Sequence, residues 1–141
     1  MQNIMVATDG SEGANRAINI AAELAKAVSG TLLIVTVARV LSPDEKQFMR
    51  IEGDMADPAE ALAQGILYDA ERTARQAGIT STKTNLVWGN PTQAIIETIG
   101  REKVDAIVVG RRGHGRLAGL LLGSVSQKLC SLAPCVVIVV P

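Results

Sequence analysis

The segment VDAIVVGRRGHGRLAGLLLGSVSQKLCSLAPCVVIVVP, residues 104–141, decides the fold, and a glycine-rich, basic loop lies at its centre. The apolar run 106–109 leads directly into Gly110, as a buried parallel strand does. From Gly123 onward the sequence is typical of a short helix, with Ser124 or Ser126 placed to cap it. The segment therefore predicts a strand, a loop and a helix in that order.

This loop has the composition of an anion site. Its glycines lack the Cβ atoms that keep a ligand from the backbone. A helix start adds unpaired N–H groups and partial positive charge. Residues 106–141 include no Asp or Glu but carry four basic residues: Arg111, Arg112, Arg116 and Lys128. The pattern predicts a phosphate site. The alternative is a glycine-rich connection that turns corners and binds nothing.

Three side chains of this segment could contact a phosphate directly. Arg112 and Arg116 could pair with phosphate oxygens, although each could equally be solvated surface charge. The hydroxyl of Ser124 or Ser126 could bind a phosphate or cap the helix. The loop matches neither known glycine fingerprint, because it lacks the Gly-Lys-Ser/Thr of a Walker A loop and the third glycine of a dinucleotide-binding loop.

The composition limits the class of protein. A chain of 141 residues suits one domain, predicted over residues 1–141. With 14 basic and 14 acidic residues and single Phe, Tyr and Trp residues, nucleic-acid binding is not expected. The sequence shows neither a signal peptide nor an apolar run of membrane-spanning length, so a cytoplasmic protein without membrane contact is expected. Cys130 and Cys135 are interpreted as small buried hydrophobes rather than a redox pair.

Strand and helix patterns alternate along the chain, which predicts an α/β fold with an open parallel sheet and helices on both faces. Ser11, Asp57 and Asn90 each start a helix. Gly30, Gly78 and Gly100 are expected to end those helices just before a strand. The stretch 39–56 shows no periodicity and is interpreted as a solvated insertion or a mobile flap. The strands are predicted over residues 4–7, 31–38, 80–87, 106–109 and 135–140.

In such a sheet, ligands bind outside the carboxyl ends of the strands, where the winding reverses. Here those ends are Asp9, residues 37–39 and Gly110, which one crevice could gather. The carboxylate of Asp9 could accept hydrogen bonds from ribose hydroxyls or an amino group, could reach a metal, or could simply form a turn at Gly10. His114 is the only histidine, and the sequence places no acidic neighbour beside it to orient it as a base. No catalytic residue is assigned.

Three motifs, in order, resemble the universal stress protein family: the opening IMVATDGSE, the motif Gly110-x2-Gly113-x9-Gly123-Ser124, and the ending APCVVIVV. Only the stretch 39–56 lies outside the resemblance. It implies a Rossmann-like, adenine nucleotide α-hydrolase-like sheet of five parallel strands in the order 3-2-1-4-5. One departure is Arg111, where ATP-binding members usually carry Ser.

The resemblance also implies a ligand and its contacts. ATP, or ADP or AMP, would lie with its adenine near Ala7, Thr8 and Asp9 and the backbone of Val37. Its ribose would lie near Asp9 and Gly110, and Mg or Mn would accompany the phosphates. The expected binding residues are Ala7, Thr8, Asp9, Val37, Val109, Gly110, Arg112, Gly113, Arg116, Gly123, Ser124, Val125 and Ser126. A homodimer is implied through the last strand, Val136–Val140.

The sequence therefore predicts an ATP-binding, nucleotide-dependent stress-response module that is not an enzyme. Two alternatives remain open at this point. One is a slow ATPase or phosphotransferase that uses the same pocket. The other is a structural dimer that binds no nucleotide.

Overall fold

The computed structural model describes residues 1–39, 42–50, 57–111 and 122–141. The strands are β1 (Asn3–Ala7), β2 (Thr31–Ala38), β3 (Thr82–Trp88), β4 (Ala106–Gly110) and β5 (Val136–Val140). The helices are α1 (Glu12–Ala27), α2 (Pro43–Arg50), α3 (Pro58–Gln76), α4 (Pro91–Arg101) and α5 (Ser124–Leu132). The strands form one parallel sheet in the order β3-β2-β1-β4-β5, which confirms the predicted topology.

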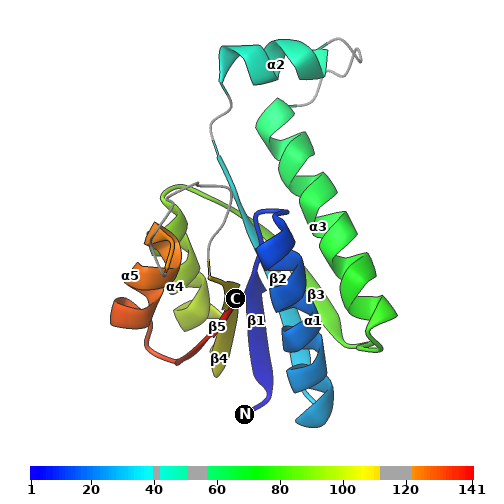
Figure 1. Ribbon diagram of the computed structural model, residues 1–141, viewed down its shortest axis with the longest axis vertical. Helices are drawn as coiled ribbons and strands as arrows, with labels where there is room; N and C mark the ends of the chain where they lie inside the picture. Colours follow the sequence, from blue (N-terminus) through cyan, green and yellow to red (C-terminus); the bar gives the residue numbers. More distant parts are fainter. Residues whose placement is uncertain (40–41, 51–56, 112–121) are drawn as a thin grey trace.

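Each face of the sheet is covered by a pair of helices (Figure 1). On one face, α1 and α3 bury small side chains such as Ala21 and Ala70 against Ile4 and Ile34. On the other face, α4 and α5 bury Ile99 and Leu129 against alternate strand residues. Successive side chains of a strand point to opposite faces, and both faces are covered, so the central strands are mostly apolar, as the apolar run in β2 predicts.

The strands do not all end at one level. Along the β1–β2 pair, Ala7 lies opposite Val35, so the last residues of β2 extend beyond the end of β1. Parallel strands followed by returning helices place every helix start at this carboxyl edge (Figure 1). The step in the sheet leaves room between those helix starts for a pocket.

The predicted helix starts are confirmed by their caps. The Ser11 hydroxyl accepts a hydrogen bond from the amide of Ala14 at 3.2 Å. The Asp57 carboxylate accepts from the amide of Ala59 at 2.9 Å. The amide oxygen of Asn90 does the same for Gln93 at 3.2 Å. These contacts satisfy first-turn amides that a helix leaves unpaired.

Of the three glycines predicted to end helices, Gly78 does so, whereas Gly30 and Gly100 do not. Helix α1 ends at Ala27, and Ser29, not Gly30, takes the left-handed conformation, with φ of 54°. Gly30 is instead required by a close approach, because a Cβ there would lie 2.3 Å from the Gln2 carbonyl oxygen. Gly78 follows α3 with φ of 100°, so its prediction as a helix-ending glycine is confirmed.

The end of α4 also differs from the prediction. Gly100 lies inside the helix, which continues to Arg101, and Lys103 takes the left-handed conformation with φ of 52°. No atom lies within 4 Å of a Cβ built on Gly100 among the described residues, so packing does not explain this glycine.

The stretch 39–56 contains a helix, α2, that the prediction of an irregular insertion missed. Ser42 starts this helix by accepting the amide of Glu45 on its hydroxyl at 3.2 Å. Pro43 and two acidic residues in the first turn are further start signals. The helix is short and mostly polar, so it lacks the extended series of apolar residues that indicates the longer helices. Figure 1 shows α2 beyond the carboxyl edge of the sheet.

The cysteine prediction is only half right. Cys130 is exposed rather than buried, and Cys135 is partly buried. Burial raises the pKa of the Cys135 thiol.

Among the described helices, none combines the length and apolar character needed to cross a membrane.

Asp105 joins the beginnings of β1 and β4. Its Oδ2 accepts hydrogen bonds from the amides of Gln2 and Asn3, each at 2.8 Å. These bonds, chiefly the one from Asn3, lower the pKa of the carboxyl below its ordinary value of 3.8. A lowered pKa in the folded state means that the carboxylate stabilises the fold above that ordinary value. The contribution is lost as the pH falls through the folded-state pKa.

We therefore expect Asp105→Asn to be less stable than the wild type at pH 6, with the difference shrinking in acid below about pH 4. Urea unfolding at both pH values measures it. Asp69→Asn, at an exposed carboxylate on α3, is the control and should change little at either pH. A difference that persists undiminished in acid would show that the Asp105 charge is not the cause.

Candidate functional site

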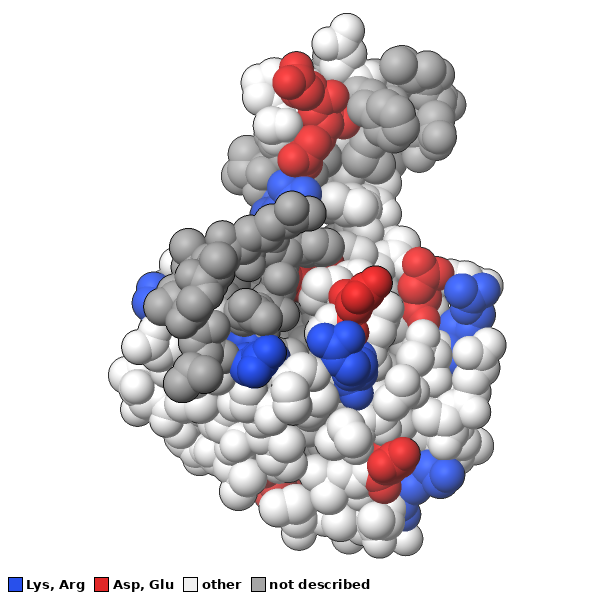
Figure 2. All heavy atoms as spheres, viewed as in Figure 1, with Lys and Arg blue, Asp and Glu red and all other residues white. Residues whose placement is uncertain are grey.

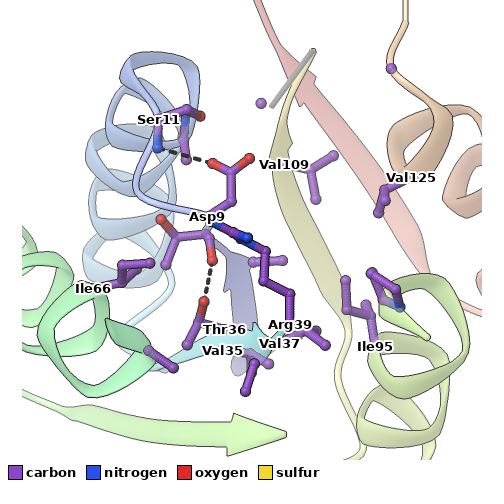
Figure 3. A pocket seen from close by; sticks show the side chains of 18 of the residues that line it. Asp9, Ser11, Val35, Thr36, Val37, Arg39, Ile66, Ile95, Val109 and Val125 are labelled. Atoms are coloured by element: carbon purple, nitrogen blue, oxygen red, sulfur yellow. Dashed lines mark hydrogen bonds between the residues drawn. The ribbon is translucent and has the colours of Figure 1, made fainter. Parts of the chain in front are cut away.

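A pocket of about 610 Å³ opens at the carboxyl edge of the sheet. It lies above the end of β1, between the overhanging end of β2 and the end of β4, and the first turns of α1, α3, α4 and α5 surround it. Figure 3 shows the side chains that line it. The crevice that the strand ends predicted is thus present.

Every described member of the predicted binding set lines this pocket: Ala7, Thr8, Asp9, Val37, Val109, Gly110, Gly123, Ser124, Val125 and Ser126. The structure therefore brings together residues from three strand ends and one helix start. Arg112, Gly113 and Arg116 lie outside the described residues, as does His114.

The floor of the pocket is fixed by hydrogen bonds around Thr8. The Thr36 hydroxyl donates to the Thr8 carbonyl oxygen at 2.6 Å, and the Thr8 hydroxyl accepts the amide of Gly10 at 3.1 Å. Both threonines are buried. These bonds hold the turn that ends β1 in one conformation.

That turn places the Asp9 carboxylate at the pocket. One of its oxygens, Oδ1, accepts the amide of Ser11 at 2.9 Å, which is the turn contact expected for an aspartate before Gly10 (Figure 3). Among the described lining residues, Asp9 and Arg39 are the charged ones. The pocket therefore carries one group of each sign, at the ends of neighbouring strands.

The start of α5 forms the side of the pocket next to β4. Contrary to the prediction that Ser124 or Ser126 caps this helix, its N-cap is Gly123, and no described side chain accepts a hydrogen bond there. The first intrahelical bond runs from the amide of Gln127 to the Gly123 carbonyl at 3.0 Å. The amides of Ser124, Val125 and Ser126 thus precede the helical ladder, and such amides attract anions.

Two hydrogen bonds anchor this helix start to the end of β4 and to the residue after it. The Ser126 hydroxyl, which lies inside the first turn, donates to the Gly110 carbonyl oxygen at 2.7 Å. The Gly123 amide donates to the Arg111 carbonyl oxygen at 2.8 Å. Arg111 and Gly123, which flank the residues 112–121 that the structure does not describe, are therefore bonded to each other.

Arg111 contributes a further polar group near this junction. Its amide extends the β4–β5 pairing by donating to the Val140 carbonyl oxygen at 2.7 Å. Its Nε is buried and has no hydrogen-bond partner among the described residues. The Arg111 side chain is not among the groups that line the pocket.

One wall of the pocket was not among the residues predicted from the sequence. Ala59, Leu62, Ala63 and Ile66 of α3 line it with apolar side chains, and Pro91 and Ile95 of α4 add to the apolar lining. The α3 residues are spaced three and four apart, so they form one helical stripe. That stripe begins in the first turn after the Asp57 cap. A helix that starts at the carboxyl edge of a parallel sheet places its first turns beside the place where ligands bind. This signal was present in the sequence.

The comparisons with known proteins agree with this geometry. The model of the universal stress protein family matches residues 1–141. A universal stress protein of Thermus aquaticus is 35% identical over 99% of this chain and 98% of its own length. A crystal structure of a universal stress protein in complex with cAMP is 32% identical, with a TM-score of 0.77 over 99% of this chain and 97% of the other.

A universal stress protein from Archaeoglobus fulgidus, solved in complex with dAMP, has a TM-score of 0.76 over 100% of this chain and 98% of the other. Because its identity is 22%, this likeness shows the fold alone. The two structures have the Rossmann-like sheet predicted here.

Proposed function

The chain belongs to the universal stress protein family, and on that premise we propose that it binds an adenine nucleotide, ATP foremost, and signals through the occupancy of the pocket. The observation that carries the proposal is the uncapped start of α5 at one side of the pocket. Amides that precede the helical ladder suit a phosphate chain. The apolar stripe of α3 and the Asp9 carboxylate suit a base and a ribose.

One relative supports the choice of ligand class. The universal stress protein solved in complex with cAMP, an adenine nucleotide, shares 32% of its residues with this chain. We propose contacts from the pocket residues named above, together with Arg112, Gly113 and Arg116 from the loop.

We further propose that the protein binds its ligand without turning it over. Two hydroxyls that line the pocket donate to backbone carbonyl oxygens, Thr36 to Thr8 and Ser126 to Gly110, so these two are not poised as nucleophiles. The residues present fit a metal ion only as a companion of the phosphates. Among the described residues, no group of three or more His, Cys, Asp or Glu side chains could hold an ion. Mg or Mn would therefore arrive on the phosphates, as Mg commonly does.

A homodimer is the proposed assembly. Strand β5 lies at the edge of the sheet, and its first residue, Val136, is 50% exposed. Leu132, the last residue of α5, is 61% exposed. An apolar edge strand can pair with a second copy of the chain.

On the face shown in Figure 2, basic and acidic side chains are interspersed over the described surface, so this face offers no extended basic area.

The nucleotide itself can be identified directly. We expect denaturation of the purified protein to release an adenine nucleotide, which mass spectrometry identifies. Calorimetry with ATP, ADP, AMP and cAMP in the presence of Mg should then show which of them binds. A folded protein that binds none of the four would contradict the proposal. Turnover of ATP at about 1 per second or faster, lost in Asp9→Ala, would favour the phosphotransferase alternative instead.

A further inference from the structure

Arg39 brings a cation to a pocket that is otherwise apolar on this side. It directly follows β2, two residues after Val37, so in extended backbone both side chains point to the same side. Both line the pocket. In the view of Figure 3, the Arg39 side chain lies between Ile66 of α3 and Ile95 of α4.

The guanidinium of Arg39 is held by α2. Its Nη1 lies 3.0 Å from Oε2 and 3.4 Å from Oε1 of Glu45. Glu45 is itself fixed in the first turn of α2, where its amide donates to the Ser42 hydroxyl. The two side chains are 58% and 42% exposed, and ion pairs this exposed contribute little to folding. The pair therefore orients the guanidinium more than it stabilises the protein.

A flat aromatic ring is the ligand group that suits these surroundings. Leu62, Ala63 and Ile66 offer an apolar wall to one face of a ring. A guanidinium is planar, weakly hydrated and stacks on π faces, which an ammonium does not do in the same way. A phosphate is the other group that an arginine binds, and it would need the charge of Arg39 but not its plane.

On the basis of the proposed nucleotide function, we propose that Arg39 is a specificity-determining residue that stacks its guanidinium on the purine base. Glu45 is the positioning residue that holds the guanidinium over the base. Helix α2, which the sequence analysis had interpreted as an insertion, then completes the base site from outside the sheet.

Two ligands and two substitutions separate the base from the phosphates. We expect Arg39→Ala to weaken binding of adenosine and of ATP by the same factor, about fivefold, because the two share the base. Arg39→Lys keeps the charge without the plane and should resemble Arg39→Ala. Calorimetry measures all six affinities. Arg72→Ala, at an exposed arginine on α3, is the control and should match the wild type.

The role of Glu45 needs a second comparison. We expect Glu45→Gln to weaken adenosine binding in the wild-type background but not in Arg39→Ala, since it acts only through Arg39. A helix-stability effect of Glu45 would instead appear in both backgrounds. Equal loss in both would therefore overturn its positioning role.

The remaining outcomes are also decisive. A loss confined to ATP and rescued by Arg39→Lys would place the guanidinium on a phosphate and overturn the inference. Unchanged affinity for both ligands in Arg39→Ala would overturn it too, while leaving nucleotide binding intact. If the wild type binds neither adenosine nor ATP, the proposed function fails and this inference fails with it.

Discussion

Asp9→Ala is expected to weaken ATP binding by about tenfold to a hundredfold. Asp9 lies in the turn that follows β1, at the floor of the pocket, where its carboxylate is the acidic group among the described lining residues. A hydrogen bond to a charged group contributes about 1.5–3 kcal/mol, and each 1.4 kcal/mol is about a factor of ten in affinity. Ribose hydroxyls donating to this carboxylate would account for the loss. Calorimetry with ATP and Mg measures it.

Asp9 has a second task, which a further variant separates. Its Oδ1 accepts the Ser11 amide and so shapes the turn before α1. Asp9→Asn keeps an acceptor for that amide but removes the charge, so it should retain the turn and still lose affinity. Asp69→Ala removes an exposed carboxylate from the outer face of α3 and should bind as the wild type does. Wild-type affinity in a folded Asp9→Ala protein would exclude the proposed ribose contact.

The parts of this fold that the sequence predicted are those encoded locally. Ser11, Asp57 and Asn90 cap helices through bonds that span two or three residues, and short-range contacts of this kind are visible in sequence. The continuous apolar run of β2 likewise identifies a strand buried on both faces. Glycine-rich strand ends then indicate where a ligand would lie.

The parts that the sequence did not predict depend on contacts between distant segments. Either Ser124 or Ser126 looks like the cap of α5 in sequence, but Gly123 is the N-cap, and the Ser126 hydroxyl donates to Gly110, 16 residues earlier. Gly30 looks like a helix-ending glycine, yet the constraint comes from the carbonyl of Gln2, the residue before β1. Such choices are fixed by register and helix packing, which neither composition nor periodicity contains. The same holds for Arg39, whose partner Glu45 lies on a helix with little apolar character.

Gly110 is the clearest case in which packing and ligand binding give different expectations for one residue. The family resemblance places it beside the ribose. In the structure, a Cβ on Gly110 would lie 2.9 Å from the carbonyl carbon of Gly13, 3.0 Å from its oxygen and 3.1 Å from the amide nitrogen of Ala14. All three are backbone atoms of the first turn of α1, which cannot rotate away as a side chain can. The end of β4 therefore contacts α1 so closely that only glycine fits.

We expect Gly110→Ala to lower the free energy of unfolding by about 1–3 kcal/mol, the usual cost of overpacking, and to weaken ATP binding at the same time. Relief of the clash must move α1 away from β4, and Ser11, Ala14 and Gly110 all line the pocket. Urea unfolding and calorimetry on the same preparation measure the two effects. Gly65→Ala is the matched control, because no described atom lies within 4 Å of its Cβ and alanine favours a helix. It should be as stable as the wild type or more so. Lost ATP binding without lost stability in Gly110→Ala would assign this glycine to the ligand instead of to the contact between β4 and α1.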